Sequence, residues 1–197
     1  MTKRILPESC AGAIIDVQDF FLAQLDGPEA RANMETNLVN FARLLDYFRI
    51  PILATLERPL EFKGALPDPL KAALAEAKLF EKDFFDLTKE KKIRDHLARL
   101  KKKQIVVAGC ETDVCVLQSC LGLIDLGYQV FVVEDLVFSS AHDVAASLAR
   151  IQAEGAVLLS YKTLYYELIQ AVGGSRRADA MVATFGPFPD DLPDQST

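Results

Sequence analysis

The segment Gln104–Cys120 reads QIVVAGCETDVCVLQSC and places a cysteine where a nucleophile would be useful. An apolar strand is predicted over Gln104–Ala108, Gly109 makes a turn, and the helix that follows carries Cys115 among its first residues. Because the N-terminal end of a helix favours a negative charge, a thiol in this position is expected to lose its proton more easily. Cys115 is therefore a candidate nucleophile, and a buried structural cysteine is the alternative.

Two further reactive side chains stand at the ends of predicted strands. Asp16 interrupts the end of the first apolar run, where a buried carboxylate is costly unless it has a partner, and Lys82 follows a short third run. Considered singly, Asp16 could cap a turn and Lys82 could be solvated. The carboxyl ends of parallel strands meet at one edge of a sheet. A carboxylate, an amine and the thiol of Cys115 are therefore expected to converge at that edge.

The elements that position these residues are short apolar runs that alternate with helical patterns. Strands this apolar, separated by helices, predict an α/β fold with a parallel sheet covered on both faces. The chain is predicted to form a single domain over residues 1–197, with a core from about 11 to 173 and a C-terminal tail over 174–197. The predicted strands are 11–17, 51–56, 78–81, 104–108, 129–134 and 156–159, and the predicted helices are 29–48, 68–76, 88–100 (with Thr88 as N-cap), 113–126, 141–154 and 162–172.

Composition excludes several classes of protein. A formal net charge of −6 and a pI near 5 argue against a nucleic-acid partner, which requires a clustered basic face. No apolar run approaches the roughly 20 residues that span a bilayer, and the N-terminus lacks the apolar segment of a secretory signal, so no membrane partner is expected. Four cysteines in a chain of this length do not make a disulfide scaffold, which favours a cytoplasmic location.

The residues at the predicted strand ends resemble those of the isochorismatase-like cysteine hydrolases. The likeness extends from about Gly12 to Gly173, and the turn that contains the cysteine is its most specific element. In this sequence the matching residues are Asp16-Val17-Gln18-Asp19-Phe20 after the first strand, Lys82 after the third, the Gly-x-x-Thr-x-x-Cys-Val turn at Gly109, Thr112, Cys115 and Val116, and the segment Gly127–Asp135.

The resemblance implies a fold and a set of roles. The fold is a three-layer α/β/α domain with a six-stranded parallel sheet of order 3-2-1-4-5-6. Asp16 would take the proton of Cys115, and Lys82 would keep the carboxylate and the thiolate charged. A cis peptide bond between Cys110 and Glu111 would turn the backbone N–H of Glu111 toward the site, beside that of Cys115, and the two donors would form an oxyanion hole.

The function implied is hydrolysis of an amide-like C–N bond in a small molecule through a covalent thioester-type intermediate. A vinyl ether hydrolase that uses Asp16 as an acid, a non-catalytic binding or regulatory protein, and a thiol redox sensor remain alternatives. The sensor ranks last because Cys110 and Cys115 lack the C-x-x-C spacing. The predicted substrate pocket consists of Gln18, Phe20, Phe21, Glu57, Phe84 and Phe85, with Glu57 as the main polar specificity group. A surface charge is the alternative for Glu57, and a core role is the alternative for each phenylalanine.

No metal or other cofactor is predicted. The related nicotinamidases carry a metal-binding Asp-x-His motif with further histidines after the second strand, whereas residues 56–69 contain no histidine. The two histidines of the chain, His96 and His142, are expected to be structural or exposed. Asp83 follows Lys82 directly and is a possible competitor for its charge.

Relatives commonly associate, so a homo-oligomer, a dimer or a tetramer, is expected. The apolar last helix offers candidate interface residues, for which packing against the sheet is the alternative. These residues are Leu164, Leu168, Ile169 and Val172.

Overall fold

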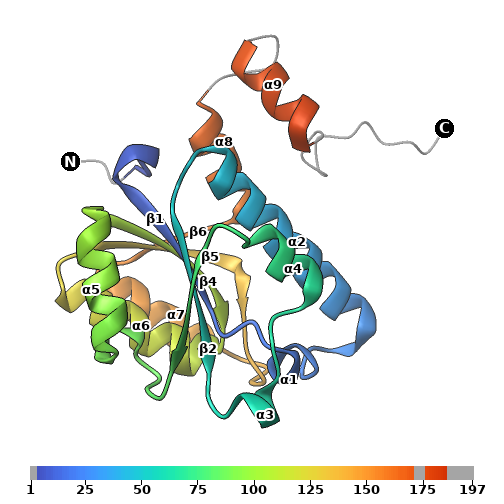
Figure 1. Ribbon diagram of the computed structural model, residues 1–197, viewed down its shortest axis with the longest axis vertical. Coiled ribbons are helices and arrows are strands. Elements are labelled where there is room, and N and C mark those ends of the chain that lie inside the picture. The colour runs from blue at the N-terminus through green and yellow to red at the C-terminus, as the bar shows by residue number, and fades with distance from the viewer. Residues whose placement is uncertain (1–3, 171–175, 186–197) are drawn as a thin grey trace.

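The computed structural model describes residues 4–170 and 176–185, and its centre is one sheet of six strands (Figure 1). The strand order is 3-2-1-4-5-6, and every neighbouring pair is parallel, which confirms the predicted fold class. The strands are β1 (Cys10–Ile15), β2 (Ile52–Glu57), β3 (Lys78–Lys82), β4 (Gln104–Cys110), β5 (Gln129–Phe138) and β6 (Val157–Leu159).

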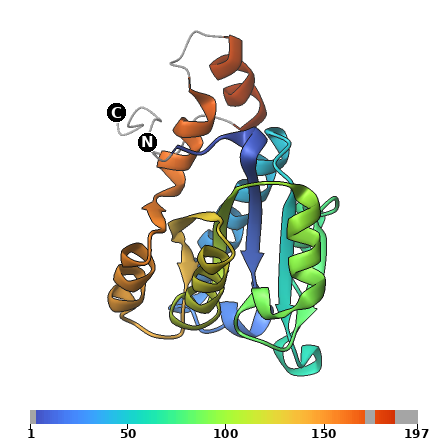
Figure 2. The same cartoon turned by 90° about the vertical axis from the view of Figure 1, so that its left-hand side faces the viewer.

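Helices cover both faces of this sheet, as the two perpendicular views show (Figures 1 and 2). One face carries α2 (Gly27–Tyr47), α4 (Asp68–Ala73) and α8 (Tyr161–Ile169), and the other carries α5 (Lys91–Leu100), α6 (Leu117–Asp125) and α7 (Ala145–Ala153). The remaining helical segments are short or lie near an end: η1 (Pro7–Ser9), α1 (Asp19–Leu22), α3 (Leu60–Lys63), η2 (Leu87–Lys89), η3 (Thr112–Val116) and α9 (Arg176–Phe185).

The two apolar cores follow from the alternation of side chains along each strand. In β1, Cys10 and Ile14 face the α2 side, whereas Ala11, Ala13 and Ile15 face the α5 side. Every residue of β1 is buried because successive side chains point to opposite faces and both faces are covered. No helix within the described residues is long and apolar enough to cross a membrane.

Several predicted boundaries were wrong. Thr88 does not cap α5: it is buried in η2, where its N–H donates to Asp86, and Glu90 stands at the N-cap of α5. The predicted helix 113–126 is present with its bounds shifted by one residue, and its first turn, η3, is π-helical before α6 continues it. β5 was predicted to end at Glu134 but continues to Phe138. Its pairing with β4 is interrupted at the exposed residues Glu134 and Asp135 by a shift of register, and the two strands pair again beyond it.

The C-terminal part differs most from the prediction. The helix predicted over 162–172 is α8, which ends at Ile169 with Gln170 in the left-handed conformation, and its predicted end at Gly173 lies outside the described residues. α9 was not predicted at all, and its Met181 is buried in the core on the α2 side. A short amphipathic segment after a glycine pair carries too weak a periodic signal to be separated from coil.

The predicted interface residues on α8 belong to the core. Leu164, Leu168 and Ile169 are at most 3% exposed and pack in the cluster that contains the strands, so the interface prediction was wrong for them. Val172 lies outside the described residues. The apolar face of α8 is needed to cover the sheet at β5, and packing against the sheet is therefore the role of these side chains.

Gly109 allows β1 and β4 to approach each other near the end where Asp16 and Cys115 lie. Its φ of 117° is in the region that L-residues avoid, and a Cβ there would lie 2.1 Å from the carbonyl oxygen of Ile15. Ile15 pairs with Gly109 in the register of the two strands. A glycine is therefore required at this point of close backbone contact.

We expect Gly109→Ala to lower the free energy of unfolding by about 3 kcal/mol or more, because the methyl group meets backbone atoms that cannot move independently. Gly127→Ala is the matched control, since its φ is also positive, at 84°, but no atom lies within 4 Å of the added Cβ. The control should lose only about 1 kcal/mol. Urea unfolding at pH 7 measures both, and equal losses would contradict the close-contact explanation.

Candidate active site

Asp16, Lys82 and Cys115 lie together at the carboxyl edge of the sheet. The Lys82 Nζ atom is 2.6 Å from Asp16 Oδ2 and 3.5 Å from Cys115 Sγ. Asp16 and Lys82 are fully buried, and Cys115 is 2% exposed. The predicted convergence is therefore confirmed, and the three residues form a compact ionic cluster shielded from solvent.

Asp16 is fixed by its neighbours on both sides of β1. It follows the last residue of the strand with a φ of 50°, a conformation that aspartate tolerates better than most residues. The hydroxyl of Thr55 in β2 donates to Asp16 Oδ1 at 2.8 Å, and the Asp16 N–H donates to the Thr55 carbonyl. On the other side, the Cys110 thiol donates to the Asp16 carbonyl at 2.9 Å. These contacts aim the carboxylate at Lys82.

Lys82 is the last residue of β3 and pairs in register with Glu57, the last residue of β2. Its carbonyl accepts a hydrogen bond from the Arg58 N–H, which ties the two strand ends together. Asp83 does not compete for Lys82, because it pairs with the Arg58 side chain at 2.8 Å on the exposed surface. The Lys82 ammonium therefore interacts with the buried side chains of the site and not with Asp83.

Cys115 occupies the five-residue turn η3 between β4 and α6. Burial, and next the negative charge of Asp16, raise the pKa of the Cys115 thiol to about 12, while Lys82 lowers it. The expectation that this thiol loses its proton easily was therefore wrong. The loss of hydration on burial outweighs the favourable position of Cys115 near the N-terminal end of the helix. The resting thiol is protonated at neutral pH.

Glu57 brings a second carboxylate to the cluster. The Cys115 thiol donates to Glu57 Oε2 at 2.9 Å, and the Lys82 Nζ atom lies 3.5 Å from the same oxygen. The other oxygen, Oε1, pairs with Lys63 of α3. Lys63 also lies above the ring of Phe21, with its Nζ 5.4 Å from the ring centroid. Of the predicted pocket residues, Glu57 is the one in direct contact with the thiol.

The other predicted pocket residues have different places. Gln18 is fully buried and braces Glu57: it accepts from the Glu57 N–H at 2.7 Å and donates to the carbonyls of Glu57 and Gly64. Phe21 is 6% exposed beside Lys63, and Phe20 packs on the ring of Phe62 at 4.8 Å.

Phe84 and Phe85 follow Lys82 in the chain but are 53% and 56% exposed, so they do not enclose the buried thiol. A chain that turns outward directly after β3 carries both rings to the surface.

The predicted oxyanion-hole segment contains one feature that the family resemblance implied, its cis peptide bond. The Cys110–Glu111 peptide bond is cis. The Glu111 carbonyl accepts hydrogen bonds from the N–H groups of Val114 and Val116 and so shapes the turn around Cys115. The Glu111 side chain accepts from the hydroxyl of Ser140 at 2.5 Å. The role of the Glu111 and Cys115 N–H groups as donors to an oxyanion stays a prediction.

The donor types of the cluster resemble those of a metal site. One ligand atom from each of Asp16, Glu57 and Cys115 lies within 4.8 Å of the others. The ammonium of Lys82, however, lies within 3.5 Å of all three residues, and a metal ion among them would meet a positive charge at close range. The cluster is therefore better suited to an ammonium than to a metal ion.

Neither histidine contributes to this cluster. His96 packs on Phe80 with ring centroids 5.3 Å apart, and partial burial lowers its pKa, whereas His142 is exposed.

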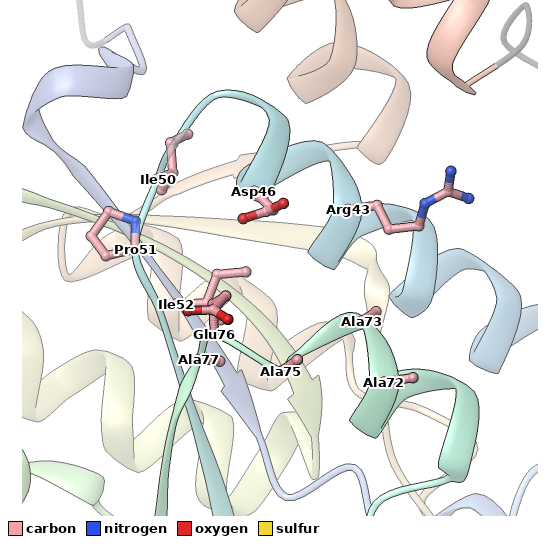
Figure 3. A pocket seen from close by; sticks show the side chains of 10 residues that line it. All are labelled: Arg43, Asp46, Ile50, Pro51, Ile52, Ala72, Ala73, Ala75, Glu76 and Ala77. Carbon is pink, nitrogen blue, oxygen red and sulfur yellow. The ribbon is translucent and has the colours of Figure 1, made fainter.

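A cavity of about 380 Å³ lies at the opposite edge of the sheet (Figure 3). Arg43 and Asp46 from α2 and Ala73 from α4 line it, together with Ile52. Ile52 is the first residue of β2 and Glu57 the last, so at about 3.3 Å per residue the cavity is roughly 16 Å from the cluster. This cavity is not the site of Cys115 chemistry.

Two residues that support the site were missed by sequence reasoning. Thr55 holds the Asp16 carboxylate, and it is the polar residue inside an apolar strand that reads ILATLE. That interruption was a usable signal, of the same kind that singled out Asp16. Lys63 gave no such signal, because a lysine in a loop-rich segment with glycine and proline nearby is usually solvated.

Comparison with known proteins identifies a family model and related sequences that match this chain. The isochorismatase domain model matches residues 11–163. Isochorismatase family protein 2A of Dictyostelium discoideum is 29% identical over 184 residues, which cover 87% of this chain and 88% of the relative.

Solved structures with the same fold include two hydrolase-family proteins of known architecture. YcaC of Escherichia coli, described as an octameric hydrolase of unknown specificity, aligns with a TM-score of 0.85 at 23% identity, covering 96% of this chain and 93% of YcaC. The nicotinamidase SaPncA of Staphylococcus aureus aligns with a TM-score of 0.67 at 21% identity, covering 77% of this chain and 98% of SaPncA. The chain belongs to the isochorismatase family, as the family model over most of its length shows.

Asp16→Asn should make Cys115 more reactive toward iodoacetamide. Removing the carboxylate charge that raises the thiol pKa should lower that pKa from about 12 by about one unit and speed alkylation at pH 8.5 about tenfold. Mass spectrometry of the labelled protein as a function of pH gives the pKa and the modified residue.

Asp19→Asn is the control, because Asp19 is exposed and pairs with Arg31 instead of the cluster. A thiol pKa that is equal in the wild type and Asp16→Asn would show that burial alone sets the reactivity of Cys115.

Proposed function

We propose that the protein is a cysteine hydrolase that cleaves an amide-like C–N bond in a small molecule. The observation that carries this proposal is the buried contact among Asp16, Lys82 and Cys115, with Lys82 Nζ within 3.5 Å of both partners. A structural cysteine does not require a buried carboxylate and a buried ammonium beside it, because each of these charges is costly to remove from water. Membership of the isochorismatase family supports the same class of reaction.

In the first half of the reaction, Asp16 takes the proton of the Cys115 thiol as sulfur attacks the carbonyl carbon of the substrate. The C=O π electrons move to oxygen and give a tetrahedral oxyanion. The backbone N–H groups of Glu111 and Cys115 are the proposed donors to that oxygen. When the C–N bond breaks, the protonated Asp16 returns its proton to the departing nitrogen, and an acyl thioester remains on Cys115.

In the second half, Asp16 takes a proton from water as the water oxygen attacks the thioester carbonyl. Collapse of this second tetrahedral oxyanion breaks the C–S bond, the thiolate recovers a proton from Asp16, and the acid product leaves. Lys82 offsets the negative charge that moves between the carboxylate and the sulfur in both halves. One carboxylate thus serves as base and acid in turn.

The raised pKa of Cys115 makes Asp16 necessary in this scheme. At pH 7 and a pKa of about 12, the fraction of free thiolate is about one in 10⁵. A base that removes the proton during attack avoids the need for a standing thiolate. Lys82 is positioned to stabilise the thiolate because its Nζ contacts Sγ directly.

A non-catalytic binding protein is the second candidate, and the burial of Cys115 favours it. At 2% exposure the thiol is reached by a substrate only after neighbouring side chains move. Vinyl ether hydrolysis with Asp16 as the acid is a further alternative, for which the thiol is not needed. The variants below distinguish the three.

Cys115→Ala should abolish ammonia release from a library of small amides, ureas and carbamoyl compounds, with no loss of the thermal unfolding transition. Asp16→Asn should reduce kcat at least about 10³-fold, since an amide side chain cannot take the thiol proton. Ser119→Ala is a control that alters a buried polar residue of the neighbouring helix α6 without touching the cluster. Wild-type turnover by Cys115→Ala would support the Asp16 acid mechanism, and a wild type inactive on the library would support a binding protein.

We also propose that the protein forms a homo-oligomer, as the E. coli YcaC structure is described to do. Its cysteines, Cys10, Cys110, Cys115 and Cys120, are buried and unpaired, which is compatible with a reducing compartment such as the cytoplasm. Light scattering at micromolar concentration should give a multiple of the 21.8 kDa chain mass. A mass of one chain would contradict the proposal.

A further inference from the structure

The mechanism above uses one of the two carboxylates that contact the cluster, and Glu57 is the other. Glu57 is 8% exposed, which is unusual for a glutamate unless the charge has partners. Its partners are the Cys115 thiol at 2.9 Å, Lys82 at 3.5 Å and Lys63. Gln18 fixes its backbone through the Glu57 N–H. Glu57 is therefore a charged group that the fold holds directly beside the nucleophile.

The charges of the cluster are already balanced. Lys82 is matched by Asp16, and Lys63 by Glu57. A substrate carboxylate placed on the thiol would add a negative charge next to Glu57, with both nearby ammonium groups already paired. An N–H group placed there would find an acceptor instead. The local electrostatics thus distinguish an amide from a carboxylate of nearly the same shape.

Distance sets which part of a substrate Glu57 would contact. A carbon about to be attacked lies about 3–3.5 Å from the sulfur. Because Glu57 Oε2 is 2.9 Å from Sγ, a nitrogen bonded to that carbon can reach hydrogen-bonding distance of the oxygen. The substrate N–H then takes the place of the thiol S–H as donor, and the S–H proton is released toward Asp16.

We propose that Glu57 is the specificity-determining residue of this site and selects uncharged substrates that carry an N–H group on or next to the carbon that Cys115 attacks. Primary amides, ureas and carbamoyl compounds have this feature. Compounds with a carboxylate in that place are excluded by repulsion. The proposal rests on the proposed function in one respect, that Cys115 is the nucleophile, and gives the substrate class of that nucleophile.

Lys63 has the opposite effect on this selection, because its positive charge reduces the repulsion between Glu57 and a substrate carboxylate. It comes from α3, and its ammonium pairs with the Glu57 oxygen that does not face the thiol. Removing the Lys63 charge leaves Glu57 less compensated, so the site should repel a carboxylate more strongly. Removing the Glu57 charge leaves Lys63 uncompensated, so the site should accept a carboxylate more readily. A purely structural role of the pair would not give opposite signs.

The test compares alkylation of Cys115 by iodoacetamide and by iodoacetate, which differ in an amide and a carboxylate beside the reactive carbon. The measured quantity is the ratio of the two rate constants at pH 8.5, divided by the same ratio for glutathione. This corrected ratio should be at least about tenfold in the wild type, since about 1.4 kcal/mol of repulsion is expected from one adjacent charge. Mass spectrometry and the Cys115→Ala variant identify the labelled residue.

Glu57→Gln should bring the corrected ratio to within about threefold of one, and Lys63→Met should raise it above the wild-type value. Glu61→Gln is the matched control, because it makes the same change on α3 at an exposed position. A wild-type ratio near one, a ratio unchanged in Glu57→Gln, or shifts of the same sign in both variants would overturn the proposal. If Glu57→Gln does not fold, Lys63→Met alone still decides the sign.

Alkylation needs no turnover, so this result is independent of whether the protein is a hydrolase. Selective alkylation by iodoacetamide together with no hydrolysis of any amide would leave Glu57 as the selector of a binding site and would contradict the hydrolase alone. Hydrolysis that depends on Cys115, together with an unselective ratio, would contradict the role of Glu57 alone. With an active substrate, Glu57→Gln should raise KM more than it lowers kcat.

Discussion

The buried ammonium of Lys82 is the constraint on which the site depends. A lysine with no exposed surface is stable only if anionic groups replace the water that it has lost. Asp16 at 2.6 Å and Glu57 at 3.5 Å supply that replacement, and the Cys115 sulfur completes the surroundings at 3.5 Å. Each of these groups would be unfavourable alone in the interior. Together they form an arrangement in which the removal of one partner leaves another charge uncompensated.

Burial and reactivity oppose each other at Cys115. Loss of hydration and the Asp16 charge raise the pKa of the thiol to about 12, so the position of the residue after β4 does not activate it by itself. In the proposed mechanism, the same closeness to Asp16 gives the thiol a base, and the closeness to Lys82 gives the future thiolate a counter-charge. The proposed mechanism thus combines a thiol that is protonated at rest with a base that removes its proton only during attack.

Parallel topology explains how residues far apart in the chain reach this arrangement. β1, β2, β3 and β4 all end at the same edge, and the in-register pairing of Glu57 with Lys82 places two of the charged groups side by side. The close approach of β1 and β4 at Gly109 sets the separation between Asp16 and the turn of Cys115. Small errors in strand register would separate the charges, because each residue advances a strand by about 3.3 Å.

The sequence alone determined the α/β class and the convergence of Asp16, Lys82 and Cys115, because apolar periodicity and polar interruptions of strands are local signals. The strand order followed from the family resemblance. It did not determine the protonation state of Cys115, which depends on burial by the whole fold. Nor did it place Lys63 on Glu57 or turn Phe84 and Phe85 outward. Those outcomes depend on how loops from different strands pack against one another, and only the tertiary structure decides such contacts.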